Sequence, residues 1–519
     1  MGHVTDLILS PEEAASNDFI SLAASKILGF QVAEIKRLKI IRKSIDARKR
    51  NIKINLRVQV VLHDETEQQE QFTLKLQDVS KSKSVIIIGA GPAGLFAAIR
   101  CIELGLKPII FERGKKVEER KKDIGLLHKT GFLNSDSNYC FGEGGAGTFS
   151  DGKLYTRSNK RGDVGRILQV LHLHGASDEI LFEAHPHIGT NKLPAIISKM
   201  RATIESCGGN VNFNSQVTDF IIDNNQILGI KTKHGESFFA DAVILSTGHS
   251  ARDIFELLKR KNILTEAKAF AMGVRVEHPQ QLIDSIQYHK EERGQYLPAA
   301  SYTLAEQVNG RGVFSFCMCP GGVIVPASTG EEEIVVNGMS SSTRNSAWAN
   351  SGIVTEIRNE DFSDFASHGA FAGLRFQEFF EKNAYKNAGK GLTAPAQRLT
   401  DFLSGKISTH LIASSYNPGL HSSPLHEWMS SFIVKSLKEG FKKFDVKMKG
   451  FISQEALLVG VESRTSSPVR IPRDKETLEH LQISGFFPCG EGAGYAGGIV
   501  SSAMDGEKCA EMVARKILS

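Results

Sequence analysis

The sequence predicts an α/β fold in which helices cover a parallel sheet. A continuous apolar run at residues 85–88 is typical of a parallel strand that is buried on both faces, and a helical pattern and a second apolar run at residues 107–111 follow it. Between about residues 270 and 450, short strand-like runs mix with helical stretches, before short strands and a final helix return. At roughly 150 residues per domain, a chain of 519 residues is expected to form about three domains.

The composition is that of an ordinary globular protein. Hydrophobic residues make up 41% and charged residues 23% of the chain, which also has 48 glycines. These values exclude a disordered chain, a collagen and a membrane-spanning bundle. The formal charge of +5 is too small to make nucleic acid or an anionic membrane the default partner.

The beginning of the chain shows no targeting signal that we recognise. It lacks a basic segment and a long apolar segment, and Asp6 replaces the Ser or Thr of a myristoylation motif. The longest mostly apolar run, residues 85–99, is too short to span a bilayer and is broken by glycines and Pro92. The seven cysteines form no paired framework, as is usual in a reducing compartment. We therefore expect a cytoplasmic protein without membrane contact.

The first 82 residues are expected to form a small α/β domain with a basic surface. Apolar spacing predicts a helix over residues 18–28, and alternation predicts a half-buried strand over residues 52–60. Between residues 36 and 57, ten basic side chains accompany one acidic residue, Asp46. This excess raises the alternative of RNA or DNA contact, but the segment lacks aromatic side chains that would stack on bases. We expect a solvated or docking surface rather than a nucleic-acid partner.

The strongest local signal is the sequence VIIIGAGPAG at residues 85–94. In such a motif Gly89 permits a tight turn, Gly91 lets the backbone approach a pyrophosphate, and Gly94 lets the helix pack on the strand. The helix N-terminus offers N–H donors and a positive dipole to phosphates. Glu112 ends the second strand, where a carboxylate can bind both hydroxyls of an adenosine ribose. The motif predicts a bound dinucleotide, either FAD or NAD.

Three further segments favour FAD over NAD. Residues 141–153 form a glycine-rich loop that can lie along a pyrophosphate or an isoalloxazine edge, and a buried strand ends at Thr247-Gly248. Near the end of the chain another strand ends at Gly490-Glu491, where the carboxylate can reach a ribitol hydroxyl. The helix after it would direct its positive end toward the N1/C2=O side of a flavin. NAD has no ribitol and would not need a second carboxylate and helix N-terminus of this kind.

With these motifs the sequence resembles the uncharacterised FAD-dependent dehydrogenases, also described as NAD(FAD)-utilizing dehydrogenase-like proteins. These are single-Rossmann flavoproteins with a core similar to that of glutathione reductase. The resemblance covers nearly the whole chain and rests on VIIIGAGPAGLFAA, FGEGGAGTFSDGKL, CMCPGG, ESRTSSP and CGEGAGYAGGI. It implies FAD as the cofactor and a substrate domain that interrupts the FAD-binding core. The cofactor contacts expected from the motifs and the resemblance are Gly89, Ala90, Gly91, Pro92, Ala93, Gly94, Glu112, Arg113, Gly145, Thr148, Lys153, Val217, Thr247, Gly248, Gly490, Glu491, Gly498 and Ile499.

Two missing motifs restrict the expected mechanism. The sequence contains no second complete strand–GxGxxG–helix unit for a nicotinamide domain. It also lacks the Cys-x4-Cys pair that disulfide reductases of this core carry near the first flavin loop. Electrons are therefore expected to come from NAD(P)H through another surface, or directly from an organic substrate.

Four other side chains are candidates for catalysis. Cys317 and Cys319 would face the same side of a strand and place two thiols over a pocket, although packing in a core is the more common role of such residues. Their spacing is too tight for a zinc site, and no metal is expected. Arg464 can hold a substrate carboxylate or bond loop carbonyls, and His249 can exchange a proton near pH 7 or bond its own loop.

The sequence thus predicts an FAD-dependent dehydrogenase or reductase that transfers hydride between FAD and an organic small molecule or NAD(P)H. One alternative is a nucleic-acid-associated flavoprotein that uses its basic N-terminal domain, and another is a flavin-free NAD(P) enzyme. The predicted domains are residues 1–82 (N-terminal α/β), 83–268 and 452–519 (the two parts of a Rossmann-type FAD-binding domain) and 269–451 (inserted α+β substrate domain).

Overall fold

The apolar run at residues 85–88 lies in the central strand of a five-stranded sheet. The sheet has the order β22-β10-β4-β5-β6, and each neighbouring pair is parallel. Its strands are β4 (Ser84–Ile88), β5 (Lys107–Phe111), β6 (Asn210–Asn212), β10 (Ala242–Leu245) and β22 (Phe486–Pro488). The structure is a computed structural model that describes residues 2–65, 72–156 and 162–519. The predicted α/β class with a Rossmann-type core is confirmed.

Alternate residues of β4 pack on opposite faces of this sheet. Val85 and Ile87 join a buried cluster on the face covered by helices, and Ile86 and Ile88 pack into a second cluster on the other face. The helical face carries α2 (Pro92–Glu103), α4 (Val164–Leu173), α5 (Leu193–Ser206) and α12 (Ile499–Leu518). The other face carries β7 (Val217–Asp223), β8 (Gln226–Thr232), β9 (Ser237–Phe239) and α6 (Arg252–Arg260). Burial on both faces explains why the whole run is apolar.

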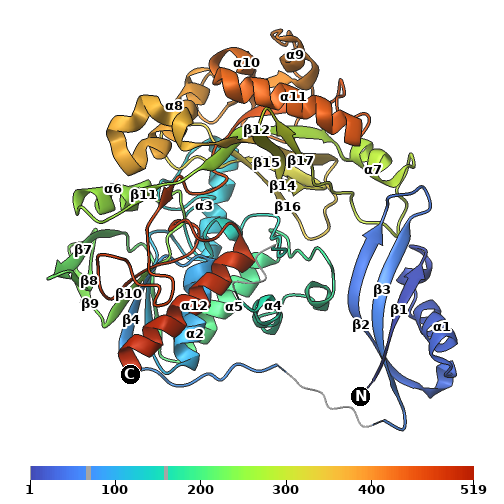
Figure 1. The fold of residues 1–519 in the computed structure, drawn as a ribbon, viewed down its shortest axis with the longest axis horizontal. Helices are drawn as coiled ribbons and strands as arrows, with labels where there is room; N and C mark the ends of the chain where they lie inside the picture. Colours follow the sequence, from blue (N-terminus) through green and yellow to red (C-terminus); the bar gives the residue numbers. More distant parts are fainter. Residues whose placement is uncertain (1, 66–71, 157–161) are drawn as a thin grey trace.

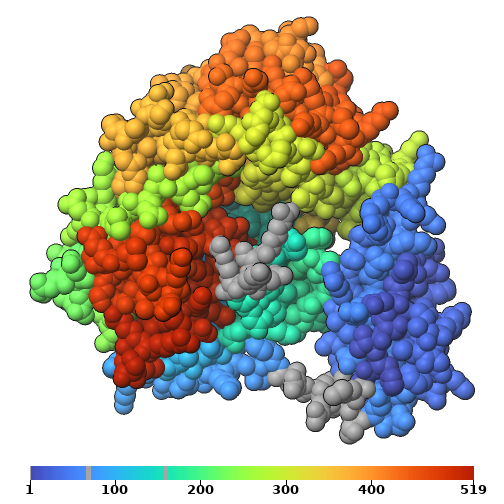
Figure 2. Space-filling model, in the orientation of Figure 1, coloured from blue at the N-terminus to red at the C-terminus, as the bar shows by residue number. Residues whose placement is uncertain are grey.

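The N-terminal residues form a small unit at one side of the molecule (Figures 1 and 2). Its antiparallel sheet has the order β1-β3-β2. The elements are β1 (His3–Leu9), α1 (Asn17–Leu28), β2 (Ile35–Asp46) and β3 (Lys53–Leu62). The basic strand β2 contacts the rest of the chain at Lys43, whose N–H donates to the carbonyl of Phe182 and whose ammonium lies 3.1 Å from Glu183. Nucleic-acid contact by this unit stays an alternative prediction.

A second, seven-stranded sheet has the order β13-β14-β17-β12-β20-β18-β19. Figure 1 shows α8, α10 and α11 over its outer side. Its strands are β12 (Phe270–Pro279), β13 (Ala305–Val308), β14 (Arg311–Cys319), β17 (Trp348–Ile357), β18 (Ala394–Arg398), β19 (Leu420–Ser422) and β20 (Leu457–Glu462). The helices of this part are α7 (Gln280–Tyr288), α8 (Ala372–Lys386), α9 (Leu399–Ser404), α10 (Leu425–Trp428) and α11 (Ser431–Lys447).

The remaining helix, α3 (Val117–Thr130), follows β5. Two small sheets pair β15 (Gly322–Pro326) with β16 (Val336–Ser340) and β11 (Glu266–Ala267) with β21 (Val469–Arg470). The position of β20 differs from the predicted division at residue 452. β20 pairs with β12 and β18 inside the seven-stranded sheet, so the chain returns to the parallel sheet only at β22. A short apolar strand fits either sheet, and its local pattern does not distinguish them. Among the described residues, no helix is long and apolar enough to cross a membrane.

Candidate flavin and substrate site

Two adjoining cavities form a groove at the carboxyl ends of the parallel strands. The first has a volume of about 510 Å³ and lies against Glu112. The second, about 1470 Å³ with its opening to solvent, extends to Glu491 and the first residues of α12. Gly91, Phe141 and residues 246–248 line both cavities, which makes the groove continuous. This edge of an open α/β sheet is where ligands bind.

Gly91 leaves space in this groove that the protein itself does not fill. Its backbone has ordinary extended dihedral angles, with φ −78° and ψ −175°. A Cβ at Gly91 would meet no atom closer than 3.9 Å, and Cβ atoms at Gly248 and Gly497 would meet none within 4 Å. At Gly94, in contrast, a Cβ would lie 2.0 Å from the carbonyl oxygen of Gly89. Gly94 therefore serves helix packing, whereas the open space at Gly91 fits the close approach of a dinucleotide phosphate.

Glu112 connects three backbone segments around the first cavity. Its buried carboxylate accepts hydrogen bonds from the N–H groups of Ala90 and Gly114, both at 2.9 Å, and of Gly142 at 3.0 Å. A carboxylate offers about four acceptor positions. One position thus remains for a ribose hydroxyl, and that contact stays a prediction.

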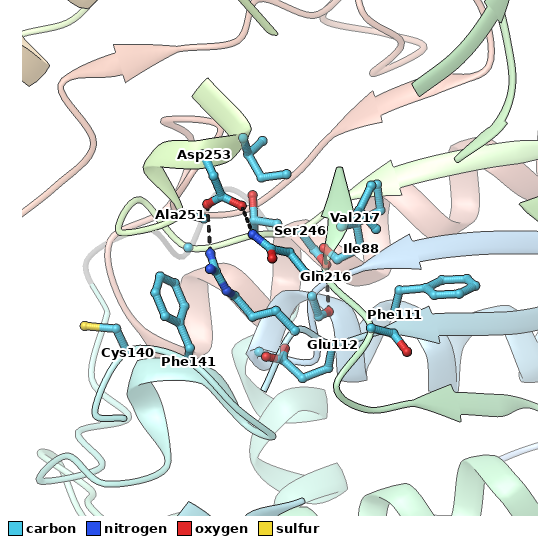
Figure 3. Close-up of a pocket in the computed structure, with 17 residues that line it drawn as sticks. Ile88, Phe111, Glu112, Cys140, Phe141, Gln216, Val217, Ser246, Ala251 and Asp253 are labelled. Atoms are coloured by element: carbon cyan, nitrogen blue, oxygen red, sulfur yellow. Dashed lines mark hydrogen bonds and ion pairs between the residues drawn. The ribbon is translucent and has the colours of Figure 1, made fainter. Parts of the chain in front are cut away.

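Arg113 is held beside Glu112 by two carboxylates. Its guanidinium lies 2.7 Å from Asp136 and 2.8 Å from Asp253, and 4.2 Å from the centre of the Phe141 ring. Gln216 donates to the other oxygen of Asp253 at 2.9 Å. Figure 3 shows Asp253, Gln216 and Phe141 around this cavity, with Val217 nearby. The charge of Arg113 is thus balanced within the protein.

Most of the predicted cofactor contacts line the groove, and five do not. The residues that line it are Gly89, Gly91, Pro92, Ala93, Glu112, Arg113, Lys153, Val217, Thr247, Gly248, Glu491, Gly498 and Ile499. Those that line neither cavity are Ala90, Gly94, Gly145, Thr148 and Gly490. Thr148, for example, is buried and donates to the carbonyl of Glu143 at 3.0 Å. It therefore stabilises the glycine-rich loop through this hydrogen bond and does not face the groove.

His249 and Glu491 face each other in the second cavity. His249 Nε2 lies 3.9 Å from Glu491 Oε1. Burial lowers the pKa of His249 to about 3 and raises the pKa of Glu491 to about 7. Burial thus favours the neutral imidazole in this structure, and proton exchange by His249 with a substrate stays a prediction. Glu491 is the group of this pair that titrates there.

The raised pKa of Glu491 predicts a pH-dependent stability for the FAD-free protein. Below the ordinary pKa of 4.5 the carboxyl is protonated in both the folded and unfolded states, and its burial adds no pH-dependent cost. As the pH rises from 4.5 to about 7, the unfolded state releases this proton while the folded state retains it. Folding thereby loses on the order of 2 kcal/mol, a value that allows for the 28% exposure of the side chain. Glu491→Gln should therefore raise the melting temperature relative to wild type at about pH 8 but not at about pH 4. An equal difference in melting temperature between variant and wild type at both pH values would contradict a raised pKa of Glu491.

Arg464 lines the second cavity, but its guanidinium is already bound by protein groups. It lies 2.7 Å from Glu333 and 2.9 Å from Glu381 and donates to Thr329 at 2.7 Å. Arg252 pairs with the same two carboxylates. Two buried glutamates thus pair with the Arg464 guanidinium and join distant parts of the chain. This arrangement favours a structural role for Arg464, and its role in holding a substrate carboxylate stays a prediction.

Cys317 and Cys319 lie at an irregularity of β14, beside Lys153. Pairing with β17 shifts register between Phe316 and Cys319, and Cys317 has a φ of 45°. The Lys153 ammonium is 3.9 Å from Cys317 Sγ and 3.8 Å from Cys319 Sγ. Cys317 lines the second cavity, whereas Cys319 is fully buried. Lys153, predicted as a cofactor contact, thus also contacts both thiols.

Two residues of this cluster were not singled out from the sequence. Asp151 is buried, lies 3.4 Å from the Lys153 ammonium and pairs with Arg344 at 2.6 Å. Burial alone would raise the pKa of Asp151, but Lys153 and Arg344 hold it far below its usual range. Asp151 belongs to the glycine-rich loop of residues 141–153, so its sequence position could have indicated a role at the site. Arg344 belongs to no recognised motif, and only the fold brings it next to Asp151.

Two family models that match parts of this chain describe FAD-dependent or FAD-binding proteins. The family model "FAD-dependent protein, C-terminal domain-like" matches residues 269–465, an FAD binding domain model matches residues 84–119, and a domain of unknown function matches residues 1–61. An uncharacterized protein of Clostridium beijerinckii is 41% identical over 510 residues, covering 95% of each chain. A digeranylgeranylglycerophospholipid reductase of Methanocella arvoryzae is 27% identical over 206 residues, covering 37% of this chain and 47% of that protein. The crystal structure of CtdE in complex with FAD covers 83% of this chain and 84% of its own, with 13% identity and a TM-score of 0.31.

The fold, together with the match to the FAD binding domain model, shows that this protein is a flavoprotein. Its cofactor is FAD, and its chemistry is that of the flavin-dependent oxidoreductases. The open groove with its glycines and helix N-termini fits this cofactor. The chain belongs to the same family as the uncharacterized Clostridium beijerinckii protein.

Proposed function

We propose that this protein is an FAD-dependent dehydrogenase or reductase that transfers a hydride between a small organic molecule or NAD(P)H and the flavin. The observation that carries the proposal is the second cavity. At one end it is lined by Glu491 and the first residues of α12, and at the other by Phe316, Cys317 and Asn337 of the inserted sheets. A small molecule that enters beside the inserted sheets would reach the end of the groove near Glu491 and α12, where the isoalloxazine is expected.

In this proposal the chain binds FAD along the groove, with the adenosine toward Glu112 and the ribitol toward Glu491. Bound FAD supplies hydride and electron transfer. The N-terminal turn of α12 places unpaired N–H groups at the second cavity, where they favour negative charge on a reduced ring. Glu491, with a pKa raised by burial to about 7, can hold or release a proton near neutral pH beside a bound substrate. The reductase from Methanocella arvoryzae is a partial relative whose name is consistent with this reaction class.

Addition of NADH, and then NADPH, to the anaerobic holoprotein tests the electron donor. We expect at least one of them to bleach the visible flavin absorbance, because hydride transfer reduces the ring. Thr247→Val changes a side chain that lines both cavities and should slow the bleaching. Thr400→Val changes a half-buried residue of α9 that lines neither cavity and should not. If neither nucleotide bleaches a flavin that dithionite does bleach, NAD(P)H is not the donor and that part of the proposal fails.

A further inference from the structure

We propose that Cys317 and Cys319 are a redox-active dithiol that exchanges two electrons with the flavin, and that Lys153 is a positioning residue for their thiolate. This inference rests on the flavin position proposed above. It differs from the Cys-x4-Cys arrangement of disulfide reductases, because these cysteines lie on the inserted sheet and not in the first flavin loop.

The backbone at the two cysteines departs from that of a regular strand. Alternate residues of a strand are about 6.6 Å apart at Cα, near the upper limit of about 6.8 Å for a disulfide. In β14 the pairing with β17 passes from Phe316–Gly352 to Cys319–Asn350, so one strand has an extra residue. Cys317 occupies the left-handed region in this bulge, with a φ of 45°. A bulge bends the strand. The Cys319 thiol donates to the carbonyl of Cys317 at 3.3 Å, and the Lys153 ammonium lies within 4 Å of both sulfurs. Both are free in this structure.

Cys317 is also accessible from two directions. It lines the second cavity of the groove and a third cavity of about 1160 Å³, including its opening, along β13 and β14. Phe316 and Cys317 are the residues common to these two cavities. A thiol at this boundary can meet the flavin on one side and a second small molecule on the other.

Positive charge surrounds the pair. The Lys153 ammonium lies within 4 Å of both sulfurs, and the fully buried Arg275 donates to the carbonyl of Cys317 at 3.3 Å. Asp151 and Glu462 are the facing carboxylates, and each is paired with a cation. The neighbouring Cys319 thiol together with Lys153 lowers the pKa of Cys317 well below its usual range, and the neighbouring Cys317 together with burial raises the pKa of Cys319. One thiolate beside one thiol is the state that disulfide chemistry requires.

The proposed step balances without another reactant. Oxidation of the two thiols forms one S–S bond between Cys317 and Cys319 and releases two electrons and two protons, which the oxidised isoalloxazine accepts. In the opposite direction, two electrons and two protons from the reduced ring break the S–S bond and restore both thiols. Lys153 keeps its proton throughout and stabilises the thiolate.

An electron count on the air-oxidised holoprotein tests the dithiol directly. Anaerobic dithionite titration should consume four electrons per FAD in wild type, two for the flavin and two for the disulfide. Cys317→Ser and, independently, Cys319→Ser should consume two. The matched control is Cys509→Ser, which removes a buried thiol from another close pair, Cys489 and Cys509, and should leave the count at four. Mass spectrometry after alkylation should find the Cys317–Cys319 peptide lighter by two hydrogens before reduction and doubly alkylated after it.

Consumption of only two electrons by wild type, with both thiols alkylated before reduction, would overturn the dithiol. A count of four in both serine variants would also overturn it. Lys153→Gln should slow alkylation of Cys317 at neutral pH, and Lys153→Arg should restore the wild-type rate. Equal alkylation rates in wild type and both variants would show that Lys153 does not stabilise the thiolate. The electron count does not depend on NAD(P)H, so failure of the nicotinamide donor and failure of the dithiol are distinguishable.

Discussion

Replacement of Gly91 by valine should remove FAD from the purified protein and leave the fold intact. The extended backbone at Gly91 suits valine, and the position of its Cβ is open to within 3.9 Å, so the folded chain tolerates the substitution. The added methyl groups would occupy the space where a phosphate approaches the N-terminus of α2. We expect FAD affinity to fall at least tenfold, about 1.4 kcal/mol or more. Flavin absorbance relative to protein absorbance, and FAD titration of the stripped protein, measure this effect.

Gly125→Val is the matched control for Gly91→Val. A Cβ at Gly125 also meets nothing within 4 Å, but this residue lies on α3 and lines neither cavity of the groove. FAD content should stay at the wild-type level in Gly125→Val. A Gly91→Val protein that retained FAD equally well would show that the phosphates do not lie at Gly91.

Glu112→Ala is expected to weaken both FAD binding and the fold. Three backbone N–H groups, those of Ala90, Gly114 and Gly142, would lose their only carboxylate partner. Each buried unpaired donor costs roughly 1–3 kcal/mol, so we expect the free energy of unfolding to fall by about 3 kcal/mol or more. Urea denaturation of the FAD-free protein measures this loss, and FAD titration measures the loss of a ribose contact.

Glu112→Gln distinguishes the two roles of Glu112. Its single carbonyl oxygen can keep the hydrogen bonds of Gly114 and Gly142, but its NH2 group would face the N–H of Ala90. The variant should therefore lose less stability than Glu112→Ala. If Glu112→Ala kept the stability and the FAD affinity of wild type, Glu112 would neither stabilise the three backbone segments nor contact the ribose.

The flavin-binding half of the fold follows from local sequence. The apolar run at residues 85–88, the glycines after it and the strand of residues 107–111 form β4, the turn into α2 and β5. The reason is that backbone sterics at Gly89 and Gly94, together with burial on both sheet faces, act over a few residues. The predicted helix at residues 18–28 also agrees with α1 within one residue.

The chemistry around the groove depends instead on residues that are far apart in the chain. Arg464 forms ion pairs with Glu333 and Glu381, which lie far from it in the sequence. The neutral state of His249 follows from burial by surrounding elements. Lys153 and Cys317 are 164 residues apart, and the bulge between Phe316 and Cys319 arises from pairing with β17. No local pattern encodes contacts of this kind.

The flavin content of the freshly purified wild-type protein shows whether the continuous groove from Glu112 to Glu491 holds FAD. We expect a flavin absorbance spectrum with close to one FAD per chain, or restoration of that ratio when FAD is added to stripped protein. A colourless protein that binds no FAD on titration would contradict this expectation.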